Sequence, residues 1–192
     1  MTYAISLVYI VLYIQLIAYL RHEQESSDFA GSSLPRWLMN IVDPKQVASR
    51  KGSNYPDTFK SAVTGREKKR LGDAAGLKNF GVNLTTLPPK SRSALRHWHI
   101  KQDEFIYVLS GELTLITDEG KSILQAGQAA GFPAGVANGH CLYNHSDEVS
   151  TYLEIGDRIL NDEVNYPDDD LIAQATEQGW QFTHKDGTPY ES

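Results

Sequence analysis

Cysteine is almost absent from this 192-residue chain, in which Cys141 is the single example. One cysteine cannot form a disulfide within the chain, so a small secreted fold that depends on disulfides is excluded. Apolar residues predominate around Cys141, and we expect its side chain to behave as a small buried hydrophobic group.

An excess of positive charge is also missing. The chain has 18 Lys and Arg against 24 Asp and Glu, a net charge of -6 and a sequence pI near 5.5. No basic field attracts phosphate backbones, and residues 1–80 lack a pair of soluble amphipathic helices, so we expect no nucleic-acid partner. A local group of basic residues between positions 47 and 76 is interpreted as solvated surface. It comprises Lys51, Arg66, Lys68, Lys69 and Arg70.

Charged side chains are absent from residues 1–20, which as a helix would extend about 30 Å, the thickness of a membrane's hydrocarbon core. This segment is either a membrane anchor, with Arg21 favouring a cytoplasmic location for the rest of the chain, or a start site assigned too early. In the second case Met39 opens the natural protein, which is then cytoplasmic without an anchor. Residues 21–40 are rich in Ser and charged groups and are interpreted as a linker.

Long apolar runs of helical period are missing after Gly81, and short β-type runs separated by turns replace them. Asp118, Glu119 and Gly120 are typical of a hairpin turn. A helical period returns only in DDLIAQATEQGW near the C-terminus. We therefore expect an all-β domain over 41–192, with a barrel core at about 80–158 and a short helical or irregular C-terminal arm.

Two histidines separated by one residue are the first candidate ligands. On a strand, His97 and His99 project from one face while Trp98 projects from the other. Four residues then separate His99 from Glu104, enough for the chain to turn and return a carboxylate to the imidazoles. Imidazole nitrogens with a carboxylate oxygen suit one divalent transition metal, namely Fe, Mn, Ni, Zn or Cu.

The complete spacing resembles the two signature motifs of the cupin superfamily. The first, H-x-H-x4-E-x6-G, is met without adjustment. The second, G-x5-P-x-G-x2-H-x3-N, is met after a two-residue insertion, which places Asn138 at the expected His position and makes His140 the carried-over ligand. His145 is an alternative if the insertion is threaded differently. The matching residues are His97, His99, Glu104, Gly111, Gly127, Pro133, Gly135, His140 and Asn144.

Longer segments resemble a bacterial subgroup of small, stand-alone, single-domain cupins over about Ile41 to Tyr190. They include RLGDAAGL, DEFIYVLSGE, FPAGVANGH and YLEIGDR. The resemblance implies a double-stranded β-helix, or jelly roll, that binds one metal ion and forms a homodimer. It implies no particular substrate.

Two classes of function fit these features. The first is a metal-dependent enzyme, an isomerase, dioxygenase, decarboxylase or lyase, that acts on a small polar metabolite of sugar or organic-acid type. The alternative is a non-catalytic module that binds or senses such a ligand. Asn83, Tyr107 and Tyr152 lie on predicted barrel strands, and we expect them to line the pocket. No separate general base is evident.

Overall fold

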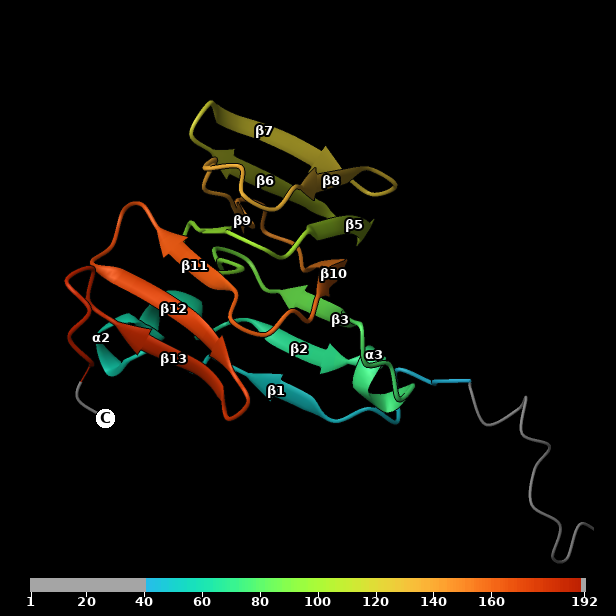
Figure 1. The fold of residues 1–192 in the computed structure, drawn as a ribbon. Helices are drawn as coiled ribbons and strands as arrows, with labels where there is room; N and C mark the ends of the chain where they lie inside the picture. The colour runs from blue at the N-terminus through green and yellow to red at the C-terminus, as the bar shows by residue number, and fades with distance from the viewer. Residues whose placement is uncertain (1–40, 191–192) are drawn as a thin grey trace, which may run out of the picture. The chain divides into compact units, whose positions relative to one another are not determined.

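Strands make up most of the regular structure in residues 41–190, the part of the chain that the computed structural model describes (Figure 1). These residues belong to one compact unit, Ile41–Ser192. The expectations for residues 1–20 and 21–40 lie outside the described residues. Among the helices between positions 41 and 190, none has both the length and the apolar character needed to cross a membrane.

The largest sheet has six antiparallel strands in the order β1-β2-β3-β10-β5-β8. Its strands are β1 (Ser49–Lys51), β2 (Glu67–Arg70), β3 (Phe80–Leu87), β10 (Ser150–Asp157), β5 (Glu104–Ser110) and β8 (Ala129–Phe132). Three short helical segments, α2 (Asp57–Lys60), a 3-10 turn (Ser61–Val63) and α3 (Leu71–Ala74), lie between its first strands in the chain.

Two smaller sheets complete the antiparallel jelly roll. One has the order β13-β12-β11-β4 and the other β7-β6-β9. Their strands are β4 (Trp98–His99), β11 (Glu163–Tyr166), β12 (Leu171–Thr176), β13 (Gly179–Thr183), β6 (Glu112–Thr117), β7 (Gly120–Gln125) and β9 (Cys141–Tyr143). The predicted all-β fold class is therefore confirmed.

The hairpin between β6 and β7 forms where the sequence predicts it. Thr117 pairs with Gly120, and the turn residues Asp118 and Glu119 lie between them. Gly120 has a φ of 128°, which an L side chain rarely adopts, so glycine is needed there.

The helical prediction for the C-terminal segment is wrong. Leu171 and Ala173 are buried, at 0% and 1% exposure, and their period of two places β12 against the core. Short apolar runs of this kind are compatible with a strand as well as with a helix. The segment forms a strand because it pairs with β11 on one side and β13 on the other. The C-terminal arm is thus a hairpin that continues a sheet of the barrel.

Two apolar clusters form the core. One lies between the six-stranded sheet and the β7-β6-β9 sheet and contains Leu87, Ile106, Val108, Leu113, Leu142 and Tyr152. The other lies under the β11–β13 strands and contains Tyr55, Val63, Leu95, Val164, Tyr166, Leu171 and Ala173. Cys141 is 2% exposed, as expected for a small hydrophobic group.

Asn144, the last residue of the second motif, has a structural role. Its buried amide donates to the carbonyls of Leu87 and Glu148, at 2.9 and 2.8 Å, and its Oδ1 accepts from Ser146. Because every polar atom of this fully buried side chain has a partner, Asn144 ties the loop after β9 to the end of β3.

Candidate metal centre

Three segments of chain bring the predicted ligands together. His99 ends β4, Glu104 begins β5, and His97 and His140 lie directly before β4 and β9. His97 and His140 form an isolated antiparallel bridge, with backbone N to O distances of 3.1 and 2.8 Å in the two directions. This bridge fixes the spacing of the two rings, because opposite residues in such a pair are close neighbours.

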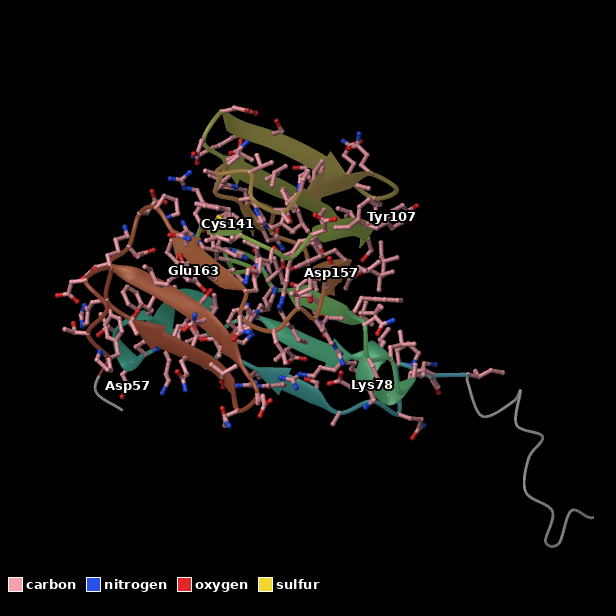
Figure 2. All side chains as sticks on the ribbon, viewed as in Figure 1. Asp57, Lys78, Tyr107, Cys141, Asp157 and Glu163 are labelled. Atoms are coloured by element: carbon pink, nitrogen blue, oxygen red, sulfur yellow. The ribbon has the colours of Figure 1, made fainter. Side chains whose placement is uncertain are left out.

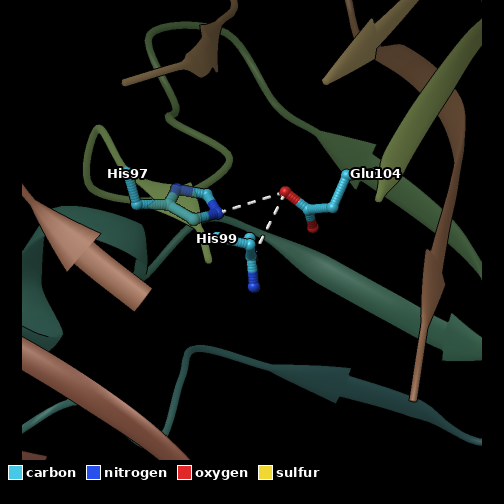
Figure 3. Close-up of side chains that lie close together, drawn as sticks. All are labelled: His97, His99 and Glu104. Atoms are coloured by element: carbon cyan, nitrogen blue, oxygen red, sulfur yellow. Dashed lines mark ion pairs between the residues drawn. The ribbon is translucent and has the colours of Figure 1, made fainter. Parts of the chain in front are cut away.

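Three imidazole nitrogens approach a single carboxylate oxygen, Oε2 of Glu104. Figure 3 shows two of them, those of His97 and His99. The distances to it are 2.9 Å from His140 Nε2, 3.4 Å from His97 Nε2 and 3.5 Å from His99 Nε2. Ligand atoms of His97, His99 and Glu104 all lie within 4.8 Å of one another.

These separations fit a coordinated divalent ion. With metal-ligand distances of about 2.1 Å, neighbouring ligands are about 3.0 Å apart in an octahedral site and about 3.4 Å apart in a tetrahedral one. The observed 2.9 to 3.5 Å lies close to both values. The set of His97, His99 and Glu104 therefore has the chemistry and the spacing of a candidate metal centre, whereas His140 is close to Glu104 but is not part of this mutually close group.

Second partners orient two of the three rings. His97 Nδ1 donates to the Leu95 carbonyl at 2.8 Å, and His99 Nδ1 donates to Asp162 Oδ2 at 2.6 Å. Asp162 is fully buried and its other oxygen accepts from the backbone N–H of Lys101 at 2.7 Å. A proton fixed on Nδ1 leaves the Nε2 lone pair free for an ion, as in most histidine metal sites.

The ring of His140 is held differently. It stacks on Phe132, with centroids 3.5 Å apart and planes at 1°, and only its Nε2 has a polar partner. Nδ1 is buried without a hydrogen-bond partner among the described residues. His140 is thus the least anchored of the four candidate ligands.

Electrostatics keep Glu104 ionised and His140 neutral, as metal binding requires, but favour the protonated form of His99. Burial opposes ionisation of Glu104, but hydrogen bonds from His140 and His97 and the nearby His99 outweigh it and hold the pKa of this carboxyl well below its usual value. Burial also lowers the pKa of His140, which favours the neutral imidazole. For His99, burial is outweighed by Asp162 and Glu104, and the net pKa is raised.

The four candidate ligands line one cavity of about 730 Å³. Gly156 lies opposite Glu104 on the adjacent strand, and a Cβ at this position would come within 3.5 Å of Glu104 Cγ. The missing side chain leaves this side of the carboxylate open to the cavity.

A buried ion pair in the same cavity was missed by the sequence analysis. Lys68 Nζ lies 2.5 and 2.8 Å from the two carboxylate oxygens of Glu154, and Asn83 Nδ2 donates to Oε1 at 3.1 Å. The side chains of Lys68 and Glu154 are only 24% and 19% exposed. One signal was available: Glu154 shares a strand face with Tyr152, two residues earlier, which was expected inside.

The expectation that the basic group between 47 and 76 is solvated is wrong for two of its members. Arg66 is 8% exposed and lines the cavity together with Lys68. Alternation along β2 explains the error, since residues 66 and 68 share one strand face, and that face is the inner one.

The three predicted pocket residues are placed differently from one another. Asn83 and Tyr152 line the cavity. Tyr107 does not: it lies on β5 between the buried Ile106 and Val108, so it projects from the outer face, where it is 40% exposed (Figure 2).

Two further histidines lie apart from the ligand cluster. His145 Nδ1 shares a hydrogen bond with Thr114 Oγ1 at 2.8 Å, and His184 pairs with Asp170 at 2.8 Å. Neither lines the cavity. The alternative threading with His145 as a ligand therefore has no support in the geometry.

Comparisons with known proteins agree with this architecture. Residues 83–156 match a family described as "Cupin domain". A sugar phosphate isomerase of the cupin superfamily from Silicibacter pomeroyi DSS-3 is 41% identical, with a TM-score of 0.76 over 79% of this chain and 97% of that one. No curated protein matches this chain.

Two further solved structures show the reach of the fold. A protein from Acidithiobacillus ferrooxidans, provisionally described as a sugar phosphate isomerase, is 27% identical, with a TM-score of 0.67 over 81% of this chain and 99% of that one. The polyketide cyclase RemF from Streptomyces resistomycificus is 20% identical, with a TM-score of 0.52 over 62% of this chain and 79% of that one, and shows the fold alone.

The chain belongs to the cupin superfamily. The whole-length similarity to a single-domain member of that superfamily, at 41% identity, establishes this. Cupins commonly bind a divalent metal, and the cluster of His97, His99 and Glu104 is the corresponding feature of this chain.

The Asp162 carboxylate generates a prediction for this site. Replacing Asp162 with Ala removes the group that orients His99, and we expect metal affinity to fall about 10- to 100-fold, the usual effect of losing such a partner. Competition titration with a chromogenic chelator measures this. Asp168→Ala, which removes an exposed partner of Arg96, is the control, and equal affinities in the two variants would contradict the assigned role.

Proposed function

We propose that this protein is a metal-dependent isomerase that acts on a small phosphorylated sugar. The observation that carries the proposal is the convergence of three imidazoles and Glu104 in a cavity that also holds the Lys68–Glu154 pair. A cavity of about 730 Å³ is of the size that proteins use for small metabolites.

The two most similar structures described above support the substrate class. Both carry a sugar phosphate isomerase description, and the chain covers nearly the whole length of each. Because one fold supports many reactions, these descriptions favour the proposal only together with the groups in the cavity.

Within the proposal, His97, His99, Glu104 and His140 hold one divalent ion. When bound, such an ion polarises a carbonyl oxygen and so acidifies the hydrogen on the adjacent carbon. The protein's own part is to keep Glu104 ionised and to hold the Nε2 lone pairs of His97 and His99 toward one point.

Glu154 is the proposed proton carrier. Conversion of an aldose to a ketose removes a proton from the hydroxyl-bearing carbon next to the carbonyl and returns a proton to the former carbonyl carbon, while the hydroxyl proton passes to the former carbonyl oxygen. Burial raises the pKa of Glu154, but Lys68 outweighs it, so the net pKa is lowered and the group is an ionised base. Strand register places it near the cluster, since Glu154 pairs with Ile106, two residues from Glu104.

Metal content tests the first part of the proposal. Wild-type protein should carry about one equivalent of a transition metal, and His97→Ala and Glu104→Ala should each lose it. His140→Ala should weaken binding, whereas Asn138→Ala should not, because Asn138 accepts a hydrogen bond from the Asp118 backbone and lies outside the ligand cavity. Elemental analysis of the purified variants makes the comparison, and metal-free wild-type protein after anaerobic preparation would contradict the site.

Proton transfer tests the second part. Glu154→Gln should lower kcat about 10²- to 10⁴-fold with little change in KM, because a positioned acid or base contributes that much. The measurement is isomerisation of phosphorylated sugars in D2O by NMR, which also reports deuterium entering at the exchanging carbon. Glu163→Gln, outside the cavity, is the control. An active Glu154→Gln variant that still incorporates deuterium would exclude Glu154 as the carrier.

We also propose that two copies associate through the outer face of the six-stranded sheet. Phe105, Tyr107 and Leu109 alternate on this face of β5 and are 43%, 40% and 44% exposed. A row of exposed large apolar groups marks an interaction surface, and an identical copy offers a complementary one. Sedimentation velocity of the wild type should give a mass twice that of the chain. The Leu109→Glu variant should give the mass of a single chain. A monomeric wild type would contradict the proposal.

A further inference from the structure

Arg66 is a buried cation that no carboxylate of the described residues neutralises. It is 8% exposed and lines the cavity. Its guanidinium donates to two backbone carbonyls, that of Ser93 and, at 2.8 Å, that of Gly52. Its Nε is buried without a hydrogen-bond partner among residues 41–190.

The other buried or paired cations along the cavity differ from Arg66 in this respect, and Arg50, which donates to Asn54, is exposed to solvent. Lys68 is paired with Glu154, and Arg158 and Arg70 both pair with Asp73. Taking a charge out of water is costly unless an opposite charge accompanies it. The carbonyls of Ser93 and Gly52 satisfy two donors of Arg66 but carry no charge. No carboxylate of the described residues forms an ion pair with Arg66, although Glu154 lies near enough to feel its charge.

Two hydroxyl groups beside Arg66 are also unpartnered. Tyr152 OH and Thr85 Oγ1 are buried without hydrogen-bond partners within the described part of the chain. Thr85 pairs with Tyr152 on one side and with Lys68 on the other, so the three side chains form one row across the inner face of the sheet. Buried polar atoms are nearly always satisfied, and a row of open donors beside a free cation is the composition of an anion site.

The protonation state of Tyr152 agrees with a donor role. Burial and the nearby negative charge of Glu154 raise the pKa of this phenol well above its usual value, and the positive charge of Arg66 and weak contacts with the Thr85 and Ser93 hydroxyls only partly oppose the rise. Tyr152 therefore keeps its proton at neutral pH and can donate it to an oxyanion.

We propose that Arg66, with Tyr152, forms the subsite that receives the phosphate group of the substrate. This rests on the proposed function and names the residue that selects phosphorylated sugars. A guanidinium presents a planar fork of N–H donors that matches phosphate oxygens. Arg66 directly precedes β2, and Glu104 begins β5. Strands β3 and β10 lie between β2 and β5 in the sheet, so the anion and the metal ligands occupy different parts of the cavity.

The test is isothermal titration of the metal-free full chain with inorganic phosphate, glucose 6-phosphate and glucose. We expect the wild type to bind the two phosphates and not glucose. Arg66→Gln should lower the affinity for both phosphates at least tenfold. Arg66→Lys, which keeps the charge but loses the planar fork of donors, should lower it less. Lys69→Gln is the matched control, because it removes one positive charge from β2 outside the cavity, where Lys69 contacts the Pro44 carbonyl.

A structural role for Arg66 predicts a different outcome. If Arg66 only ties Gly52 to Ser93, then Arg66→Gln lowers the melting temperature, but the folded variant binds phosphate with the same affinity as the Lys69→Gln control. That result overturns the proposal. Should Arg66→Gln not fold, Tyr152→Phe decides, because it keeps the ring and removes only the open hydroxyl. A severalfold loss of phosphate affinity supports the subsite, and unchanged affinity overturns it.

Failure of this subsite is distinguishable from failure of the metal centre. The titrations use metal-free protein, so phosphate binding does not require the four ligands to hold an ion. A wild type that carries metal but binds neither phosphate overturns the subsite alone. A wild type that binds both phosphates through Arg66 but never carries metal overturns the proposed isomerase and leaves the subsite in place.

Discussion

One carboxylate oxygen, Oε2 of Glu104, organises the interior of this domain. Two imidazoles from the segment just before it and a third from His140, 36 positions further on, approach it, and their nitrogens lie 2.9 to 3.5 Å away. A buried carboxylate is tolerated only with such partners, because its desolvation is costly. The arrangement therefore serves the fold and the site together: groups that neutralise Glu104 in the metal-free protein are the groups that would share an ion with it.

The anchors of these ligands extend the site into parts of the chain beyond the two motifs. Asp162, directly before β11, orients His99, and β11 itself pairs with β4, the strand that ends in His99. The hairpin of β12 and β13 continues that sheet, so the C-terminal segment supports a ligand and is not a peripheral arm. This explains why the whole of residues 41–190, and not only 80–158, is needed to describe the cavity.

The sequence predicts local geometry well and long-range pairing poorly. His97, His99 and Glu104 could be found because their spacing follows from alternation and one short turn, and the same motif logic reached His140 across its insertion. Lys68 and Glu154 are 86 positions apart, and only the register of β2, β3 and β10 reveals that they meet. The prediction of a helix near Leu171 was wrong for the same reason. The local pattern is compatible with either a helix or a strand, and pairing with distant strands determines which one forms.

Specificity in such a cavity has to come from these long-range groups. The polyketide cyclase RemF shares the fold at 20% identity, so the barrel by itself does not select a reaction. In this chain the inner face of the six-stranded sheet runs from Arg66 and Lys68, through Asn83 and Glu154, to Glu104. Arg66 lies at one end of this surface and Glu104 at the other, with the Lys68–Glu154 ion pair between them, and this order orients a ligand that has an anionic group at one end and carbonyl or hydroxyl oxygens at the other. A ligand with two neutral ends would leave Arg66 without an ion-pair partner. The binding free energy of such a ligand would be less favourable, and this difference would discriminate against it.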